Sequence, residues 1–250
     1  MKILLLGGTA EARELAEALA MRSDIDAMLS LAGATSRPAR LALPVRCGGF
    51  GGIDGLACYL TQHGIDLVID ATHPFAARMS AHAVGACQGL GIPLWRIDRP
   101  AWRPQAGDDW HDAVDPDSAA GQLAGFGRRV FLSVGARSLA PFEAVADKLW
   151  IVRSIEAPKP PPAFDDWTLI RDRPPFSLAQ EIALLREHAI DVLVAKNSGA
   201  PATRAKLDAA RTLAIPVLMI SRPSLPMPDR IFSTPMALWA ALDTVHQVSG

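Results

Sequence analysis

The apolar residues at the start of the chain change at two glycines from a continuous run to a helical spacing. Ile3 to Leu6 are consecutive apolar residues, which is typical of a parallel strand buried on both faces. After Gly7 and Gly8, apolar residues from Ala12 to Ala20 recur on one face of a helix. The pattern therefore predicts a strand, a tight glycine turn and a helix.

This turn is a candidate phosphate site, because the first N–H groups of a helix lack partners within the helix and attract anions. The dinucleotide-binding fingerprint Gly-x-Gly-x-x-Gly needs glycines at positions where the chain has Gly7, Thr9 and Ala12. The match is partial, so an ordinary turn of a parallel sheet stays an alternative. The residues predicted to contact a cofactor here are Gly7, Gly8, Thr9, Ala10 and Glu11.

Apolar runs alternate with helical patterns along the rest of the chain. Strands are predicted at 27–31, 66–70, 93–97, 130–134, 149–153, 168–170, 192–195 and 216–220. Helices are predicted at 53–63, after Phe75 up to about residue 90, and at 118–123, 139–146, 177–188, 203–213 and 235–248. This alternation predicts an α/β protein with two Rossmann-like parallel-sheet domains. The expected bounds are 1–98 for an NADP(H)-binding domain, 99–128 for a connecting segment and 129–250 for a second domain on the substrate side.

Two segments of the first half align with two segments of the second half. His63–Pro74 aligns without gaps to His188–Gly199, and Gly91–Pro100 matches Ala214–Pro223. Duplication of a βαβ unit explains this agreement, although all such units resemble one another to some extent. The repeat predicts two similar sheets, with polar strand ends facing a cleft between them.

The loop after the second predicted strand carries hydroxyl groups and arginines but no acidic residue. In a dinucleotide fold, an acid at this place binds the ribose of NAD, whereas an arginine accommodates the additional phosphate of NADP. Ser30, Ser36 and Arg37 are therefore predicted to contact the cofactor, and NADPH is predicted over NADH. A solvated basic loop is the alternative.

The polar residues that follow two other strands are candidates for the reaction itself. Ligands of open parallel sheets bind beyond the carboxyl ends of the strands, so Thr72, His73 and Pro74 should lie beside the first glycine turn. His73 is a candidate proton donor or nicotinamide contact, although histidines at strand ends are often structural. Lys196 ends an apolar strand and must reach water, an anion or a substrate.

Composition excludes several classes of partner. The formal net charge of −1 over 250 residues argues against a nucleic acid or a membrane surface as partner. Three cysteines and six histidines have no zinc-ligand or disulfide spacing, so no metal is expected. No signal-peptide or membrane-span pattern is found, and a cytoplasmic protein is expected. The oligomeric state is open, and a monomer is compatible with the sequence.

Three motifs together resemble the precorrin-6A reductase family, the NADPH-dependent enzymes of cobalamin biosynthesis. They are Lys2–Arg13, Asp70–Ala76 and Lys196–Gly199, at separations that cover nearly the whole chain. The resemblance implies hydride transfer to one carbon–carbon double bond of precorrin-6A, giving precorrin-6B, with no metal or flavin in the step. It also implies two Rossmann-like domains with the macrocycle between them.

The substrate implied by the resemblance carries acetate and propionate side chains. Cationic and polar groups suit such a ligand, and the predicted substrate contacts are Arg137, Lys196, Asn197, Ser198, Gly199 and Arg204. His73 and Lys196 are the predicted catalytic residues. No residue decides between the metal-free and the cobalt-containing substrate.

Two further functions stay open at this point. One is an NADP-dependent reductase of another small substrate, which oxidises NADPH with simpler compounds. The other is a non-catalytic nucleotide-sensing module, in which one Rossmann-like half reports cofactor status to a partner.

Overall fold

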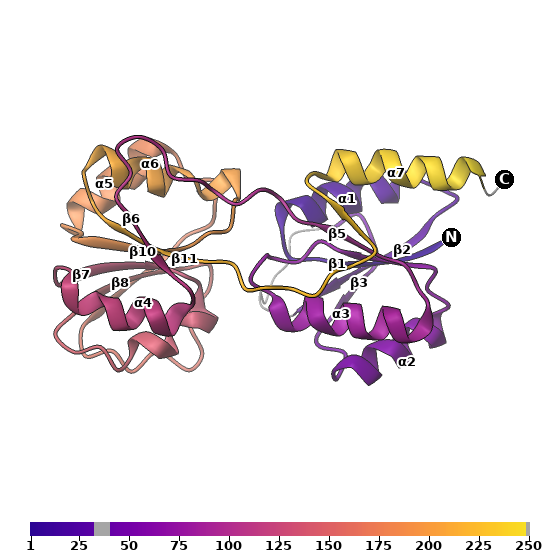
Figure 1. The fold of residues 1–250 in the computed structure, drawn as a ribbon, viewed down its shortest axis with the longest axis horizontal. Coiled ribbons are helices and arrows are strands. Elements are labelled where there is room, and N and C mark those ends of the chain that lie inside the picture. The colour runs from indigo at the N-terminus through magenta and orange to yellow at the C-terminus, as the bar shows by residue number, and fades with distance from the viewer. Residues whose placement is uncertain (33–40, 249–250) are drawn as a thin grey trace. The chain divides into compact units, whose positions relative to one another are not determined.

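The structure is a computed structural model that describes residues 1–32 and 41–248. The chain forms two compact units, which are drawn in Figure 1: residues 1–100 with 224–250 make unit 1, and residues 101–223 make unit 2. Each unit is a six-stranded sheet covered by helices, and this confirms the predicted α/β fold with two parallel sheets. Within the described ranges, no helix has the length and apolar character that crossing a membrane requires.

The unit 1 sheet has the strand order β12-β5-β4-β1-β2-β3, and all neighbouring strands are parallel. Its strands are β1 (Lys2–Leu6), β2 (Asp26–Leu31), β3 (Val45–Cys47), β4 (Leu67–Asp70), β5 (Leu94–Ile97) and β12 (Arg230–Phe232). Its helices are α1 (Ala10–Ala20), α2 (Ile53–His63), α3 (Ala77–Leu90) and α7 (Pro235–Val248). Helices α1 and α7 cover one face of the sheet, and α2 and α3 cover the other (Figure 1).

The continuous apolar run of β1 serves both faces. Ile3 and Leu5 belong to the core that also contains Leu15 of α1, whereas Leu4 and Leu6 pack in the core beneath α2 and α3. Successive side chains of a strand point to opposite faces, so a strand covered on both sides needs apolar residues at every position. The predicted parallel strand buried on both faces is therefore confirmed.

The unit 2 sheet has the order β6-β11-β10-β7-β8-β9, again with all neighbours parallel. Its strands are β6 (Trp110–Ala113), β7 (Arg129–Ser133), β8 (Leu149–Ser154), β9 (Trp167–Arg171), β10 (Val192–Lys196) and β11 (Val217–Ile220). Its α-helices are α4 (Pro116–Gln122), α5 (Leu178–Glu187) and α6 (Ala205–Thr212), and its 3₁₀ turns are η1 (Leu123–Gly125), η2 (Ala136–Ser138), η3 (Ala140–Phe142) and η4 (Pro201–Thr203).

The two halves of the chain exchange one edge strand each, and this corrects the predicted domain bounds. Strand β6, from the first half, joins the sheet of unit 2, and β12, from the second half, joins the sheet of unit 1. The segment 99–128, expected as a connection, supplies β6, which pairs with β11 of unit 2. The segment 224–250, expected in the second domain, supplies β12, which pairs with β5, and α7, whose Leu238 joins the core of unit 1. Both exchanged strands are edge strands of three or four residues with exposed positions, so no buried run marks them in the sequence.

Two further expectations differ from the structure. A helix was predicted at 139–146, but within that stretch only the short 3₁₀ turn η3 forms, at Ala140–Phe142. Val45–Cys47 forms β3, a strand that is absent from the predicted ones. The aligned segments 63–74 and 188–199 contain β4 and β10, which occupy the same place in their sheets, while the duplication itself and the cleft stay predictions.

Two helical glycines should respond in opposite ways to alanine. In α2, a Cβ on Gly55 would lie 1.8 Å from the carbonyl oxygen of Phe50, whereas one on Gly89 in α3 would meet no atom within 4 Å. We expect Gly55→Ala to lower the free energy of unfolding by about 1–3 kcal/mol through overpacking. Gly89→Ala should raise it by roughly 0.5–1 kcal/mol, because alanine loses less backbone entropy in a helix. Urea unfolding measures both changes, and equal effects at the two positions would contradict the packing described for Phe50.

Candidate functional site

The glycine turn after β1 is tied to the end of β4 through Thr9. Thr9 caps α1: its Oγ1 accepts a hydrogen bond from the Ala12 N–H at 3.2 Å and donates one to the Ala71 carbonyl at 2.8 Å. A Cβ on Gly7 would lie 2.6 Å from Cδ1 of Leu29 and 3.2 Å from Cβ of Ala12 in α1, so glycine leaves room for α1 to approach the sheet. Thr9 thus fixes two strand ends relative to each other.

The same turn leaves backbone donors available for an anion. Within the described ranges, no acceptor is found for the N–H groups of Gly8, Ala10 and Glu11. Gly8 has a φ of +123°, and an added Cβ would meet no atom within 4 Å, so the space around it is open. The Glu11 carboxylate, predicted to contact the cofactor, accepts a hydrogen bond from Nη1 of the buried Arg99 at 2.7 Å. The turn can therefore take a phosphate at an uncovered helix N-terminus.

The strand ends of unit 1 form a row across the sheet. Arg96 of β5 pairs in register with Asp70 of β4, Asp70 with Leu6 of β1, Leu6 with Ser30 of β2, and Ser30 with Arg46 of β3. Residues in register on parallel strands point to the same face of a sheet. Ser30 also accepts the Gly7 N–H at its carbonyl, at 2.9 Å, so it lies beside the turn, while its contact with the cofactor stays a prediction. Ser36 and Arg37 lie outside the described residues.

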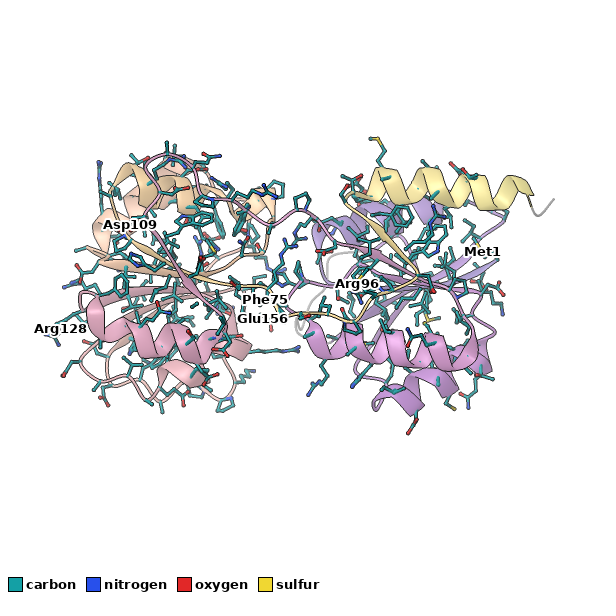
Figure 2. The ribbon with its side chains drawn as sticks, viewed as in Figure 1. Met1, Phe75, Arg96, Asp109, Arg128 and Glu156 are labelled. Carbon is teal, nitrogen blue, oxygen red and sulfur yellow. The ribbon has the colours of Figure 1, made fainter. Side chains whose placement is uncertain are left out.

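Asp70 is the centre of a buried polar network at the end of β4. Only 1% of its surface is exposed, and its carboxylate accepts hydrogen bonds from Ser80 Oγ at 2.7 Å and Arg96 Nε at 3.0 Å. Thr72 donates two further hydrogen bonds to Oδ1 of the same carboxylate, from its hydroxyl at 2.7 Å and from its N–H at 3.1 Å. Figure 2 shows Arg96 on the sheet of unit 1, between its helical layers. The predicted contact Thr72 is therefore held by a buried ion pair that sequence analysis did not identify.

His73 follows this network and is held in one orientation. Its Nδ1 accepts a hydrogen bond from the Phe75 N–H at 3.2 Å, and its carbonyl accepts the Ala76 N–H at 2.7 Å. Because Nδ1 is an acceptor, the neutral imidazole carries its hydrogen on Nε2. Thr72 and His73 are half-buried, and the next residue, Pro74, is buried. His73 can thus act as a donor through Nε2.

In unit 2, Lys196 stands at the carboxyl end of β10. Its Nζ donates to Oγ of Ser138, in the turn η2 after β7, at 2.6 Å. Burial lowers the pKa of Lys196 to about 8, because the charged form loses solvation. Arg137 lies in the same turn and is exposed. These two predicted substrate contacts therefore come from turn η2 and the end of β10.

The residues after Lys196 form a turn that is held by its own side chains. Both ends of the Asn197 amide are paired with the Trp102 backbone, at 2.8 Å to its N–H and 3.0 Å to its carbonyl. Arg222 donates to the carbonyls of Asn197 and Ser198, and Gly199 has a φ of +72°. Asn197 thus fixes the shape of the turn, and its direct contact with the substrate stays a prediction.

The predicted cation Arg204 immediately precedes helix α6, and Lys206 within α6 is a cation that sequence analysis missed. Arg204 donates from Nε to Asp208 at 3.3 Å, and its buried Nη2 has no hydrogen-bond partner among the described residues. Lys206 is buried and donates to Oγ of Ser133, the last residue of β7, at 2.9 Å. Burial and the nearby Arg153 lower the pKa of Lys206 to about 7. A lysine inside the apolar face of a helix was the available signal.

Comparison with known proteins gives consistent results over nearly the whole chain. A family model described as precorrin-6x reductase CbiJ/CobK matches residues 2–243. A precorrin-6A reductase of Rhodococcus erythropolis is 48% identical over 228 residues, covering 90% of each chain. A cobalt-precorrin-6A reductase of Priestia megaterium is 28% identical over 236 residues, covering 89% of this chain and 91% of the relative. The solved structure of a CobK precorrin-6A reductase has a TM-score of 0.91 at 42% identity, covering 97% of this chain and 96% of that one.

The two hydrogen bonds of the Thr9 hydroxyl should contribute measurably to the free energy of unfolding. We expect Thr9→Val to lower the free energy of unfolding by about 1–2 kcal/mol, because it removes the helix cap and leaves the Ala71 carbonyl without its donor. Thr9→Ser keeps the hydroxyl and should stay within about 0.5 kcal/mol of the wild type. Thermal or urea unfolding compares the three proteins, and a valine variant as stable as the serine variant would contradict the role given to this hydroxyl.

Proposed function

The chain belongs to the precorrin-6x reductase family, and from this premise we propose that it uses NADPH to reduce one carbon–carbon double bond of precorrin-6A, giving precorrin-6B. The observation that carries the proposal is the family match over residues 2–243, together with 48% identity to a precorrin-6A reductase. The geometry of the strand ends then suggests which residues serve each ligand.

The cofactor is assigned to the carboxyl edge of the unit 1 sheet. NADPH supplies a hydride, and the chain has to bind its phosphates and orient its nicotinamide. The N–H groups of Gly8, Ala10 and Glu11 suit the pyrophosphate, because they have no acceptor within the described ranges. Thr72, His73 and Pro74 follow the neighbouring strand β4 and suit the nicotinamide end. Contacts from Ser36 and Arg37 stay predictions from the sequence.

The substrate is assigned to the strand ends of unit 2. Lys196, Arg137 and Arg204 are cations, and precorrin-6A presents carboxylates. The Arg204 Nη2 is a donor without a partner among the described residues, which a carboxylate oxygen would satisfy. The metal-free substrate is favoured, because identity is 48% to a relative named for precorrin-6A and 28% to one named for the cobalt form.

Reduction of the double bond needs a proton in addition to the hydride. The hydride adds to one carbon, and the proton must reach the other carbon of the same bond. His73 and Lys196 are the candidate donors, since each stands at a strand end: the ammonium group of Lys196 carries an acidic hydrogen, whereas the His73 ring must first take up a proton and then donates as the imidazolium. A cytoplasmic location completes the proposal, supported by the free thiols of Cys47, Cys58 and Cys87, which a reducing compartment maintains.

The direct test is anaerobic turnover of precorrin-6A. We expect the purified chain to oxidise one NADPH for each precorrin-6A reduced, with a change in the tetrapyrrole absorption spectrum, and to use NADH far less well. Cobalt-precorrin-6A is the matched control substrate. Folded protein that binds NADPH but oxidises none with either tetrapyrrole would contradict the proposal and favour a nucleotide-sensing role.

The pH dependence of substrate capture tests Lys196. Its ammonium form attracts a carboxylate and is lost as the pH rises through about 8, so kcat/KM for precorrin-6A should fall about tenfold between pH 7 and pH 9. Lys196→Arg stays charged throughout this range and should remove that fall, whereas Lys196→Met should show a low kcat/KM at every pH. An identical profile in the wild type and the methionine variant would leave Lys196 without this role.

The variant His73→Gln tests His73 in the same assay. Its kcat should be lower than that of the wild type if Nε2 of His73 supplies the proton.

A further inference from the structure

We propose that Arg46, on β3, binds the 2′-phosphate of NADPH and so selects this cofactor over NADH. The inference rests on the proposed function, because it takes the glycine turn of unit 1 as the pyrophosphate site. It adds a residue that the glycine fingerprint and the loop after β2 do not point to. Four observations carry it: the position of Arg46, the way its guanidinium is held, its charge balance and the space beside it.

The position follows from the register of three neighbouring strands. Leu6 of β1, which precedes the glycine turn, pairs with Ser30, and Ser30 pairs with Arg46. Neighbouring strands lie about 4.8 Å apart, so Arg46 stands roughly 10 Å along the edge from the turn. In dinucleotide folds the adenosine ribose lies near the end of the second strand, on this side of the pyrophosphate. Arg46 is therefore placed where an additional phosphate on that ribose would lie.

The guanidinium of Arg46 is held in a fixed plane by neutral groups. Its Nη1 donates to Ser30 Oγ at 3.1 Å and to the Gly48 carbonyl at 2.9 Å, and its Nη2 donates to the Gly49 carbonyl at 3.1 Å. The group lies 3.8 Å over the ring centre of Phe50. A guanidinium has five N–H hydrogens, and these bonds use three of them. The Nε hydrogen and one Nη2 hydrogen have no acceptor among the described residues and suit a phosphate.

The charge of Arg46 distinguishes it from the other arginines near this edge. Arg96 is paired with the Asp70 carboxylate, and Arg99 is paired with that of Glu11. In the part of the chain that the structure describes, Arg46 contacts only neutral oxygens and aromatic rings. Its positive charge is therefore not balanced by a neighbouring carboxylate. A dianionic phosphate would balance it.

The loop that follows Arg46 leaves room for a ligand. An added Cβ at Gly48, Gly49, Gly51 or Gly52 would meet no atom within 4 Å, so the backbone there is open on the side that a side chain would take. Phe50 is the one residue of this stretch with a side chain, and its ring supports the guanidinium. The alternative is that Arg46 only shapes this loop through Gly48 and Gly49. The two explanations differ in one respect: a role limited to the loop would not depend on the 2′-phosphate.

The test compares ligands that differ only in the 2′-phosphate. Calorimetric titration of the full chain with NADPH and NADH, and with 2′,5′-ADP and 5′-ADP, gives four dissociation constants for each variant. We expect Arg46→Ala to weaken NADPH and 2′,5′-ADP by about 10- to 100-fold, the range for hydrogen bonds to a charged group. NADH and 5′-ADP should change less than about threefold, a difference below 1 kcal/mol.

Arg230→Ala is the matched control. Arg230 is an exposed arginine on β12, at the opposite edge of the same sheet, and its guanidinium lies 4.9 Å from the ring centre of Trp95. It should leave all four dissociation constants unchanged. Arg46→Lys keeps the charge but loses the planar fork, so it should give an intermediate, phosphate-selective loss, and it serves if the alanine variant does not fold.

Three outcomes would overturn the proposal. If Arg46→Ala weakens NADPH and NADH equally, Arg46 acts on the loop or on the adenine. If it weakens neither cofactor, Arg46 is not a contact. Both results leave the proposed reductase function intact, provided that the wild type binds NADPH. A wild-type protein that binds neither cofactor would contradict the proposed function and the assignment of Arg46 together.

Discussion

The carboxyl edge of the unit 1 sheet depends on one buried carboxylate, that of Asp70. Removing one partner of a buried ion pair costs about 3–5 kcal/mol, so the pair of Asp70 with Arg96 strongly constrains the end of β4. Thr72 is bound to the same carboxylate, and the Ala71 carbonyl is bound to Thr9 in the glycine turn. The turn that suits a phosphate and the segment that carries His73 are therefore fixed together before any ligand arrives, which lowers the ordering cost of binding.

The strand ends of the two sheets differ in chemistry, although both sheets have the same strand order. In unit 1 the donors after β1 are backbone N–H groups at a helix N-terminus, and these suit phosphates. In unit 2 the ammonium groups of Lys196, at the end of β10, and Lys206, in α6, donate hydrogen bonds to the hydroxyls of Ser138 and Ser133. Burial lowers the pKa of both lysines, and a carboxylate beside either would restore its charge. The proposal therefore assigns the dinucleotide to the edge of the unit 1 sheet and the polycarboxylate to that of the unit 2 sheet.

The sequence predicted the features that depend on local pattern and missed those that depend on pairing. The run Ile3–Leu6 and the helix after Gly8 were correct, because a strand buried on both faces and an amphipathic helix each leave a periodic signal. The exchanged strands β6 and β12 leave no such signal, and their assignment depends on which edge they join. Arg46 was missed for the same reason: only the register with Ser30 brings it to the row of strand ends. Lys196 was found because a charge at the end of an apolar strand needs a partner, but the partner itself, Ser138, could not be predicted.

The central claim is that NADPH binds at the glycine turn of unit 1 through backbone N–H groups. Amide NMR of the ¹⁵N-labelled chain during titration with NADP⁺ tests it directly, since an N–H that donates to a phosphate shifts strongly. The account predicts the largest shifts at Gly8, Ala10 and Glu11, with unit 2 amides little changed. Saturable binding whose largest shifts fall on unit 2, with the three turn amides unmoved, would contradict it.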